Sequence, residues 1–191
     1  QRYLTDDNPN DARALLLASF LAEKRRDLPV AYSFAKHCIA MAPQMSAGYI
    51  NLGKVAQEMY RVDEADEAYS LAVQYARSDR ERNMTVVNRA AALANFGLFR
   101  EAELIAAEGL RDQPGHKKLL GTLGMCQLAR RDWVNGWANY DEIIGTPQRL
   151  RINYAGEPVW NGESGATVAV YGEQGLGDEI SFASMFPDLI A

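Results

Sequence analysis

The sequence has few of the residues that build metal sites and no run long enough to cross a membrane. Its 191 residues include two cysteines and two histidines, of which only His37 and Cys38 are neighbours. A structural zinc site needs about four such ligands at close spacing, so we expect no bound metal and no metal cofactor. No stretch of about eighteen consecutive apolar residues occurs, so we expect no membrane span.

The two cysteines, Cys38 and Cys126, fall far apart in segments with helical composition. We expect both to be small buried side chains in a reducing compartment.

The first residues, Gln1 to Leu4, have neither the apolar core nor the cleavage pattern of a signal peptide. They are typical of the end of a helix, so we expect the chain to begin inside a longer protein, and we expect a cytoplasmic location.

An excess of positive charge is also missing. The chain has 20 lysines and arginines against 25 aspartates and glutamates, a net charge of −5. Proteins that bind nucleic acid or anionic membranes in a general way carry a basic patch or stripe. The composition therefore argues against these partners, while a hydrophobic content of 48% is ordinary for a soluble globular protein.

What the sequence does contain is a spaced pattern of large and small residues between positions 49 and 72. Counted from Ser46 as position 1, large residues stand at positions 4 and 7, small ones at 8 and 11, and a small, an aromatic and a small residue at 20, 24 and 27. These are Tyr49, Leu52, Gly53, Ala56, Ala65, Tyr69 and Ala72. A small residue on one helix admits a bulky residue of its neighbour, so the pattern predicts two interlocked antiparallel helices.

The small residue at position 20 recurs along the chain at steps of 34, 37 and 34 residues, as Ala31, Ala65, Ala102 and Gly136. This periodicity predicts four stacked helical hairpins. The longer middle step predicts three extra residues in the turn at residues 78–83, which is charged and easily solvated. At the start of the array, Asp11 is the expected N-cap of the first helix.

This spacing resembles the tetratricopeptide repeat, a helix–turn–helix unit of about 34 residues. The resemblance implies an all-α superhelix of about four hairpins over residues 1–147, with a concave face that binds a protein or peptide partner. On that face, position 6 carries Asn51 and Asn88, and Lys54 and Asn95 are expected nearby. Asparagine amides can hydrogen-bond an extended peptide backbone. The alternative is that asparagine is simply common at this position.

After Pro147 the helical period ends. Residues 148–166 contain three glycines and one proline and show no helical period, so we expect them to form a linker. Residues 167–171 are an apolar run that is typical of a buried strand, and a glycine-rich turn and a helical stretch follow. We therefore expect residues 167–191 to begin an α/β domain. From spacing alone, Asp178 is either a helix N-cap or part of an anion-binding turn.

The last 34 residues, 158–191, resemble bacterial and phage proteins that join tetratricopeptide repeats to a heptosyltransferase-like glycosyltransferase domain of the GT-B fold. The matching elements are Pro-x-Trp-x-Gly at 158–162 and Glu-Gln-Gly-x-Gly-Asp at 173–178. The resemblance implies that Asp178 is the base that deprotonates the sugar acceptor. It also implies an acceptor-side loop made of Gly175, Leu176 and Gly177, and a nucleotide-sugar donor in place of a cofactor.

Two functions stay open at this point. In the first, the intact protein is a glycosyltransferase whose repeats position a glycan or protein acceptor. The donor-binding half of a GT-B enzyme is absent here, so this chain alone is not expected to be active. In the second, the chain is a non-enzymatic scaffold that binds a peptide or protein partner, and residues 167–191 shield the last repeat.

Overall fold

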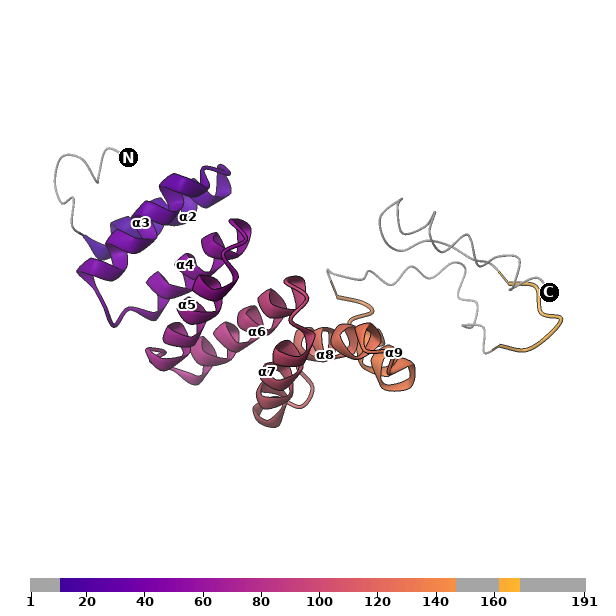
Figure 1. The fold of residues 1–191 in the computed structure, drawn as a ribbon. Coiled ribbons are helices and arrows are strands. Elements are labelled where there is room, and N and C mark those ends of the chain that lie inside the picture. Colours follow the sequence, from indigo (N-terminus) through magenta and orange to yellow (C-terminus); the bar gives the residue numbers. More distant parts are fainter. Residues whose placement is uncertain (1–10, 147–161, 169–191) are drawn as a thin grey trace. The chain divides into compact units, whose positions relative to one another are not determined.

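The computed structural model describes residues 11–146 and 162–168 (Figure 1). The chain divides into two compact units, Gln1–Glu142 and Ile143–Ala191, and the fold below is that of the first. Its helices are α2 (Ala12–Lys24), α3 (Leu28–Met41), α4 (Ser46–Glu58), α5 (Val62–Gln74), α6 (Asp79–Asn95), α7 (Phe99–Asp112), α8 (Lys117–Ala129) and α9 (Trp133–Asp141). None of the helices in the described ranges is long and apolar enough to span a bilayer.

Consecutive helices pair as four hairpins: α2 with α3, α4 with α5, α6 with α7, and α8 with α9. The second helix of each hairpin also packs on the first helix of the next one. The all-helical stack predicted from the 34-residue period is therefore confirmed, and residues 11–146 contain no β-strand. Of the strand predicted over 167–171, residues 167 and 168 have no regular structure, and the other three lie outside the described residues.

The interlock of large and small residues holds each hairpin together. In the second hairpin, a Cβ atom added to Gly53 would lie 2.9 Å from Cε1 of Tyr69, whose side chain is almost fully buried. In the fourth, a Cβ atom on Gly124 would lie 2.5 Å from the backbone nitrogen of Tyr140. Gly53 thus makes room for the ring of Tyr69, and Gly124 lets the backbones of α8 and α9 touch, as the size pattern predicts.

The first hairpin achieves the same approach with a hydroxyl. Position 8 is Ser19, which is completely buried and donates a hydrogen bond from Oγ to the carbonyl oxygen of Ala31 at 3.0 Å. Because that oxygen lies on the partner helix, the bond ties α2 to α3 and satisfies the buried hydroxyl. Ser46 acts in the same way in the second hairpin, where its Oγ donates to the carbonyl oxygen of Ala72 at 2.9 Å.

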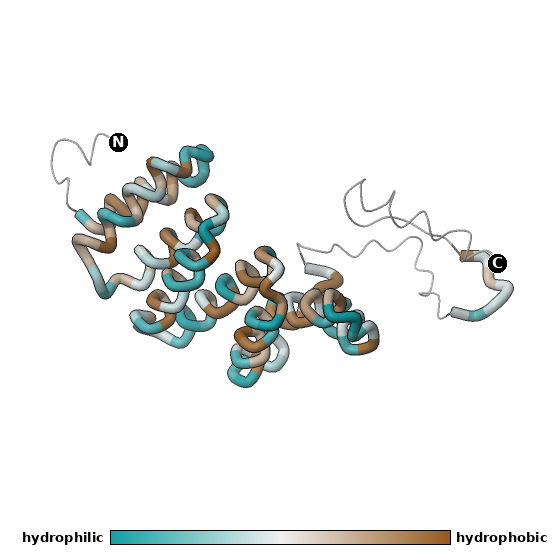
Figure 2. The backbone as a smooth tube through the Cα atoms, viewed as in Figure 1, coloured by the Kyte–Doolittle hydropathy of each residue, from teal (hydrophilic) through white to brown (hydrophobic). Residues whose placement is uncertain are grey.

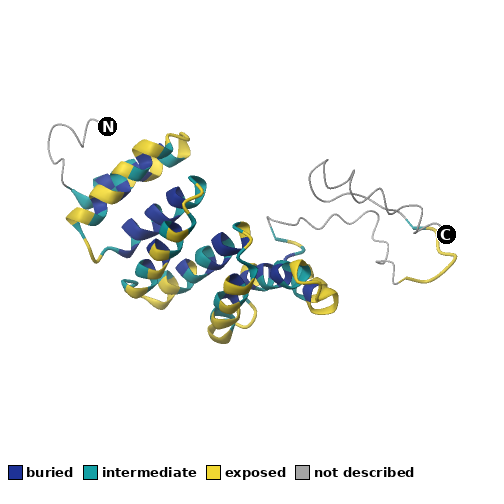
Figure 3. Ribbon diagram, viewed as in Figure 1, coloured by how far each residue is buried: buried dark blue, intermediate teal, exposed yellow. Residues whose placement is uncertain are grey.

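The buried residues form a series of small clusters between neighbouring helices. One cluster joins Ala22, Ala31 and Val55 across the first two hairpins, and another joins Val87, Ala106 and Leu119 across the last two. Figure 3 shows this as dark buried segments on the facing sides of the helices, and Figure 2 shows hydrophobic and hydrophilic residues mixed along each helix. Both cysteines belong to this interior, as expected.

Each hairpin turn contains one residue in the left-handed conformation. Arg26, Tyr60, Gly97 and Arg131 have φ angles of 62°, 57°, 78° and 66°, and all four occupy position 15 of their repeat. This residue reverses the chain between the two helices. Glycine adopts the left-handed conformation without strain.

The N-cap predicted at the start of the array is confirmed, since the Asp11 carboxylate accepts a hydrogen bond from the backbone N–H of Arg13 at 2.9 Å.

The prediction of a longer turn at residues 78–83 is wrong. Helix α6 begins at Asp79 and has 17 residues, whereas α4 has 13. Ser78 caps it by accepting a hydrogen bond from the backbone N–H of Glu81 at 3.2 Å, and the Glu81 carboxylate accepts one from the N–H of Arg77 at 2.9 Å. This reciprocal cap stabilises the first turn of a helix, so the extra residues lengthen α6.

The change in helix length coincides with a change in stacking. First helices of neighbouring repeats pack on each other in the pairs α2–α4 and α6–α8, but α4 and α6 make no comparable contact. The second and third hairpins are joined instead through α5 and α6. The array is thus regular at its two ends and altered between its second and third repeats.

We expect Gly124→Ala to lower the free energy of unfolding by about 1–3 kcal/mol, although alanine is the better helix former. The added Cβ would meet backbone atoms of α9, which cannot rotate away. The measurement is the urea midpoint of the helical circular-dichroism signal. Gly115→Ala is the matched control, because no atom lies within 4 Å of a Cβ there; a midpoint for Gly124→Ala at or above wild type would contradict the interlock.

We expect Tyr60→Gly to raise the free energy of unfolding by roughly 0.5–1 kcal/mol, because glycine adopts the left-handed conformation of this position without strain. The tyrosine side chain is 83% exposed, so little packing is lost. Gly97→Ala is the converse variant: with φ at 78° and no atom near its Cβ, it should destabilise through backbone strain alone. The measurement is the melting temperature of each variant. A higher value for Tyr60→Gly and a lower one for Gly97→Ala would support this account, and shifts of the same sign would refute it.

Candidate peptide-binding surfaces

The four residues predicted to line a peptide groove lie on first helices of their hairpins. Asn51 and Lys54 belong to α4, and Asn88 and Asn95 belong to α6. Asn95 is exposed, and the other three are partly exposed. The first helices α2 and α4 pack on each other, as do α6 and α8, but α4 and α6 do not pack in this way. The row of first helices is therefore interrupted between Asn51 and Lys54 on one side and Asn88 and Asn95 on the other.

Asn51 has a structural bond as well as a predicted binding role. Its Nδ2 donates to the carbonyl oxygen of Leu16 in α2 at 3.1 Å, which links the first helices of two successive repeats. The amide group is therefore fixed in orientation. Its Oδ1 atom remains an acceptor for a further hydrogen bond.

Two apolar side chains extend this surface over α2. Leu17 and Phe20 are 57% and 40% exposed, and they occupy positions 6 and 9 of the first repeat. Asn51 and Lys54 occupy the same positions in the second repeat, and α2 packs beside α4. We call these four residues the first-helix patch. The sequence analysis missed its apolar half, although two large apolar residues at positions 6 and 9 were visible in the sequence.

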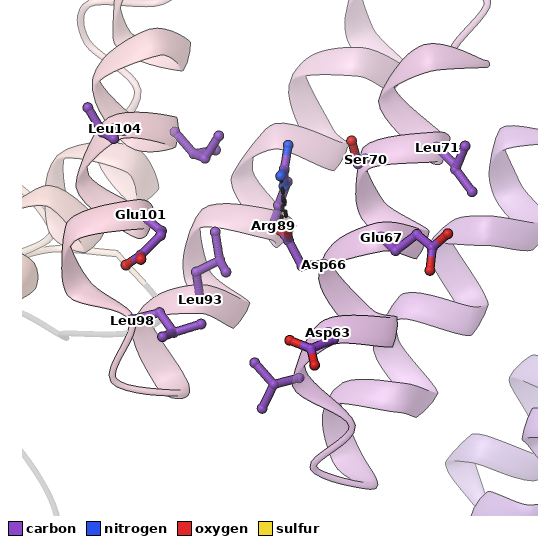
Figure 4. Close-up of a pocket in the computed structure, with 12 residues that line it drawn as sticks. Asp63, Asp66, Glu67, Ser70, Leu71, Arg89, Leu93, Leu98, Glu101 and Leu104 are labelled. Carbon is purple, nitrogen blue, oxygen red and sulfur yellow. Dashed lines mark hydrogen bonds and ion pairs between the residues drawn. The ribbon is translucent and has the colours of Figure 1, made fainter.

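A concave feature lies where α5, α6 and α7 meet. It has a volume of about 590 Å³, within the range of clefts that take small ligands. Six of its twelve lining residues are Val, Leu or Ile: Val62, Leu71, Leu93, Leu98, Leu104 and Ile105. We call it the α5–α7 groove (Figure 4). None of the predicted groove asparagines lines it.

An ion pair crosses this groove from α5 to α6. Arg89 donates from Nε and Nη2 to the two carboxylate oxygens of Asp66 at 2.6 and 3.0 Å, and both side chains are partly exposed. Figure 4 shows the pair between the two helices, with Glu101 on the α7 side. Such a two-point contact holds guanidinium and carboxylate in a fixed geometry.

Buried titratable groups in the helical region are protonated at neutral pH. Burial raises the pKa of the Cys126 thiol to about 11, and burial also raises the pKa of Cys38. Burial, with a smaller contribution from Glu23, raises the pKa of Tyr69. Thiols of this kind are poor nucleophiles. Within the described ranges, no three His, Cys, Asp or Glu side chains are grouped so that they could hold a metal ion.

The residues implied by the glycosyltransferase resemblance lie outside the described residues. These are Asp178 with Gly175, Leu176 and Gly177, together with residues 158–161 of the Pro-x-Trp-x-Gly element. Their roles stay predictions.

Comparison with solved structures relates the helical stack to known proteins. A crystal structure of MamA is 13% identical, covers 74% of this chain and 80% of its own, and superposes with a TM-score of 0.64. The structure of pilF from Pseudomonas aeruginosa is 17% identical, covers 69% of this chain and 60% of its own, and has a TM-score of 0.60. No protein-family model and no curated protein matches the sequence.

Identities this low show a shared fold and leave function open. The repeat length, the interlock at positions 8, 20 and 24, and these structural matches agree. The chain has a tetratricopeptide-repeat-like helical fold. A glycosyltransferase domain is supported neither by the described residues nor by these comparisons.

Proposed function

We propose that the tetratricopeptide-repeat-like region is a protein-interaction module that binds an extended peptide segment of a partner through its first helices. The observation that carries this proposal is the first-helix patch. There, exposed apolar side chains of α2 adjoin polar side chains of α4. Repeat arrays of this type present long surfaces made by successive units, which suits extended ligands.

The chemistry of the patch suits a peptide. The fixed amide of Asn51 presents Oδ1 toward a peptide N–H, and Lys54 supplies a cation for a carboxylate or a carbonyl oxygen. Leu17 and Phe20 provide area against which apolar side chains can lose contact with water. Backbone hydrogen bonds would give affinity, and the apolar side chains would give selectivity.

The second pair, Asn88 and Asn95, would extend the contact onto α6. In the described part of the chain neither side chain makes a hydrogen bond, and Met84, one turn before Asn88, is 53% exposed. Because the spacing between α4 and α6 is altered, we assign the first-helix patch as the primary contact and the α6 residues as an extension.

The test is selection of linear peptides from a phage-displayed random library against the chain, followed by affinity measurement with variants. We expect Leu17→Ser with Lys54→Ala to weaken the selected peptides about tenfold or more, because an apolar contact and a polar contact are both lost. Asn51 is left intact in this variant, since its amide also holds α2 to α4.

The matched control is Asp63→Asn with Glu101→Gln on the α5–α7 groove, which should leave these affinities unchanged. Failure to enrich any peptide, or equal affinity for wild type and the Leu17/Lys54 variant, would contradict peptide binding at this patch. Weaker binding by Asn88→Ala with Asn95→Ala alone would move the contact to α6.

We propose a glycosyltransferase as the second candidate function of the intact protein, supported by the match at residues 173–178. In this proposal a carboxylate within hydrogen-bond reach of the acceptor hydroxyl removes its proton as the sugar carbon is attacked. Asp178 has that role, Gly175 to Gly177 shape the acceptor side, and the repeats position the acceptor.

In a protein that also carries a donor-binding half, we expect Asp178→Asn to abolish sugar transfer and leave the circular-dichroism spectrum unchanged. Transfer is measured with radiolabelled nucleotide-sugars. Turnover at the wild-type rate in the Asp178→Asn variant would remove this residue from the role of base.

A further inference from the structure

We propose that the α5–α7 groove is a second docking site, which binds a short segment of a partner protein carrying cationic and apolar side chains. This site differs from the first-helix patch in position and in charge. Its occupant is a basic, leucine-type peptide segment, and the argument rests on the lining of the groove and on its uncompensated negative charge.

The apolar part of the lining is accessible. Leu104 is 66% exposed, and Val62, Leu71, Leu98 and Ile105 are each partly exposed around the more deeply buried Leu93. Apolar side chains that line a groove can pack against an apolar side chain of a ligand, which removes both surfaces from water. The groove therefore favours a ligand with branched aliphatic side chains over a purely polar one.

The charged part of the lining is of one sign. Four carboxylates line the groove, those of Asp63, Asp66, Glu67 and Glu101, against the single guanidinium of Arg89. Both guanidinium contacts go to Asp66, which neutralises that pair. Asp63 and Glu101 are exposed, stand on opposite helices, and take part in none of the ion pairs found in the described region. A cationic segment in the groove would therefore meet carboxylates on both walls.

Position in the fold separates this groove from the peptide surface on the first helices. Its walls are α5 and α7, the second helices of their hairpins, and α6 contributes Arg89 and Leu93. Asn88 immediately precedes Arg89, and successive residues on a helix are turned by about 100°. Asn88 and Arg89 therefore serve different sides of α6, and the two sites can be altered independently.

The experiment measures fluorescence anisotropy of a labelled synthetic peptide in which arginine and leucine alternate. Matched peptides carry glutamate in place of arginine or serine in place of leucine. We expect the arginine–leucine peptide to bind, and Asp63→Asn with Glu101→Gln to weaken it roughly tenfold at low salt. Raising NaCl from about 0.05 to 0.5 M should weaken wild-type binding by a larger factor than binding to the variant, which keeps Glu67.

Two controls and one further test variant make the result specific. Glu108→Gln removes one exposed carboxylate from α7 outside the groove and should leave affinity unchanged. Leu104→Ser tests the apolar wall independently of charge, and should weaken binding as well. Leu17→Ser with Lys54→Ala should have no effect, so that failure of this proposal and failure of peptide binding at the first-helix patch are distinguishable.

The proposal is overturned if the arginine–leucine peptide does not bind, if the glutamate peptide binds equally well, or if the Asp63/Glu101 variant keeps wild-type affinity. Binding of spermidine with the same affinity as the peptide would also overturn it, since the site would then be one for small polyamines. Circular dichroism confirms that each variant remains helical before its affinity is interpreted.

Discussion

The structure depends on the close approach of two helices in each hairpin, and that approach depends on the absence of a side chain or the presence of a very small one. Gly53 lies against the ring of Tyr69, and Gly124 lies against the backbone of α9. Where glycine is replaced, as at Ser19, a buried hydrogen bond across the pair takes its place. Since interiors are packed without slack, each hairpin then behaves as a stiff unit whose outward side chains occupy fixed positions. Both candidate surfaces are made by such side chains.

Stacking of stiff units makes the length of a single helix consequential. In repeat proteins each unit touches only its neighbours, so a change at one junction is not averaged over the array. The cap formed by Ser78 and Glu81 lengthens α6 to 17 residues, and at this same junction the contact between first helices is reduced. The bidentate pair between Asp66 and Arg89 links α5 to α6 there, and the α5–α7 groove opens beside it. The altered junction and the groove therefore lie at the same place in the array.

Residue sizes along the sequence predicted the hairpins because the interlock is local, involving pairs such as Gly53 and Tyr69 only 16 residues apart. The sequence also identified the cap at Asp11 and the interior positions of Cys38 and Cys126. The three extra residues predicted in the turn at 78–83 belong to α6, because this charged stretch also contains the cap that makes it helical. The α5–α7 groove could not be predicted, because its lining comes from three helices whose spacing depends on that cap. Left-handed Arg26, Tyr60 and Arg131 were also missed, since these residue types rarely adopt that conformation.

The two proposed sites differ in a way that bears on what the chain could assemble. The first-helix patch combines Lys54 and a neutral amide with apolar area, whereas the α5–α7 groove combines apolar area with unpaired carboxylates. A segment that suits one site is therefore disfavoured at the other, because a basic segment meets like charge at Lys54 and an acidic one meets like charge at Asp63 and Glu101. Two different segments could consequently bind at once, on adjacent repeats. If both belonged to one partner, the second contact would form at a high effective concentration, and modest affinities at each site would suffice for stable association.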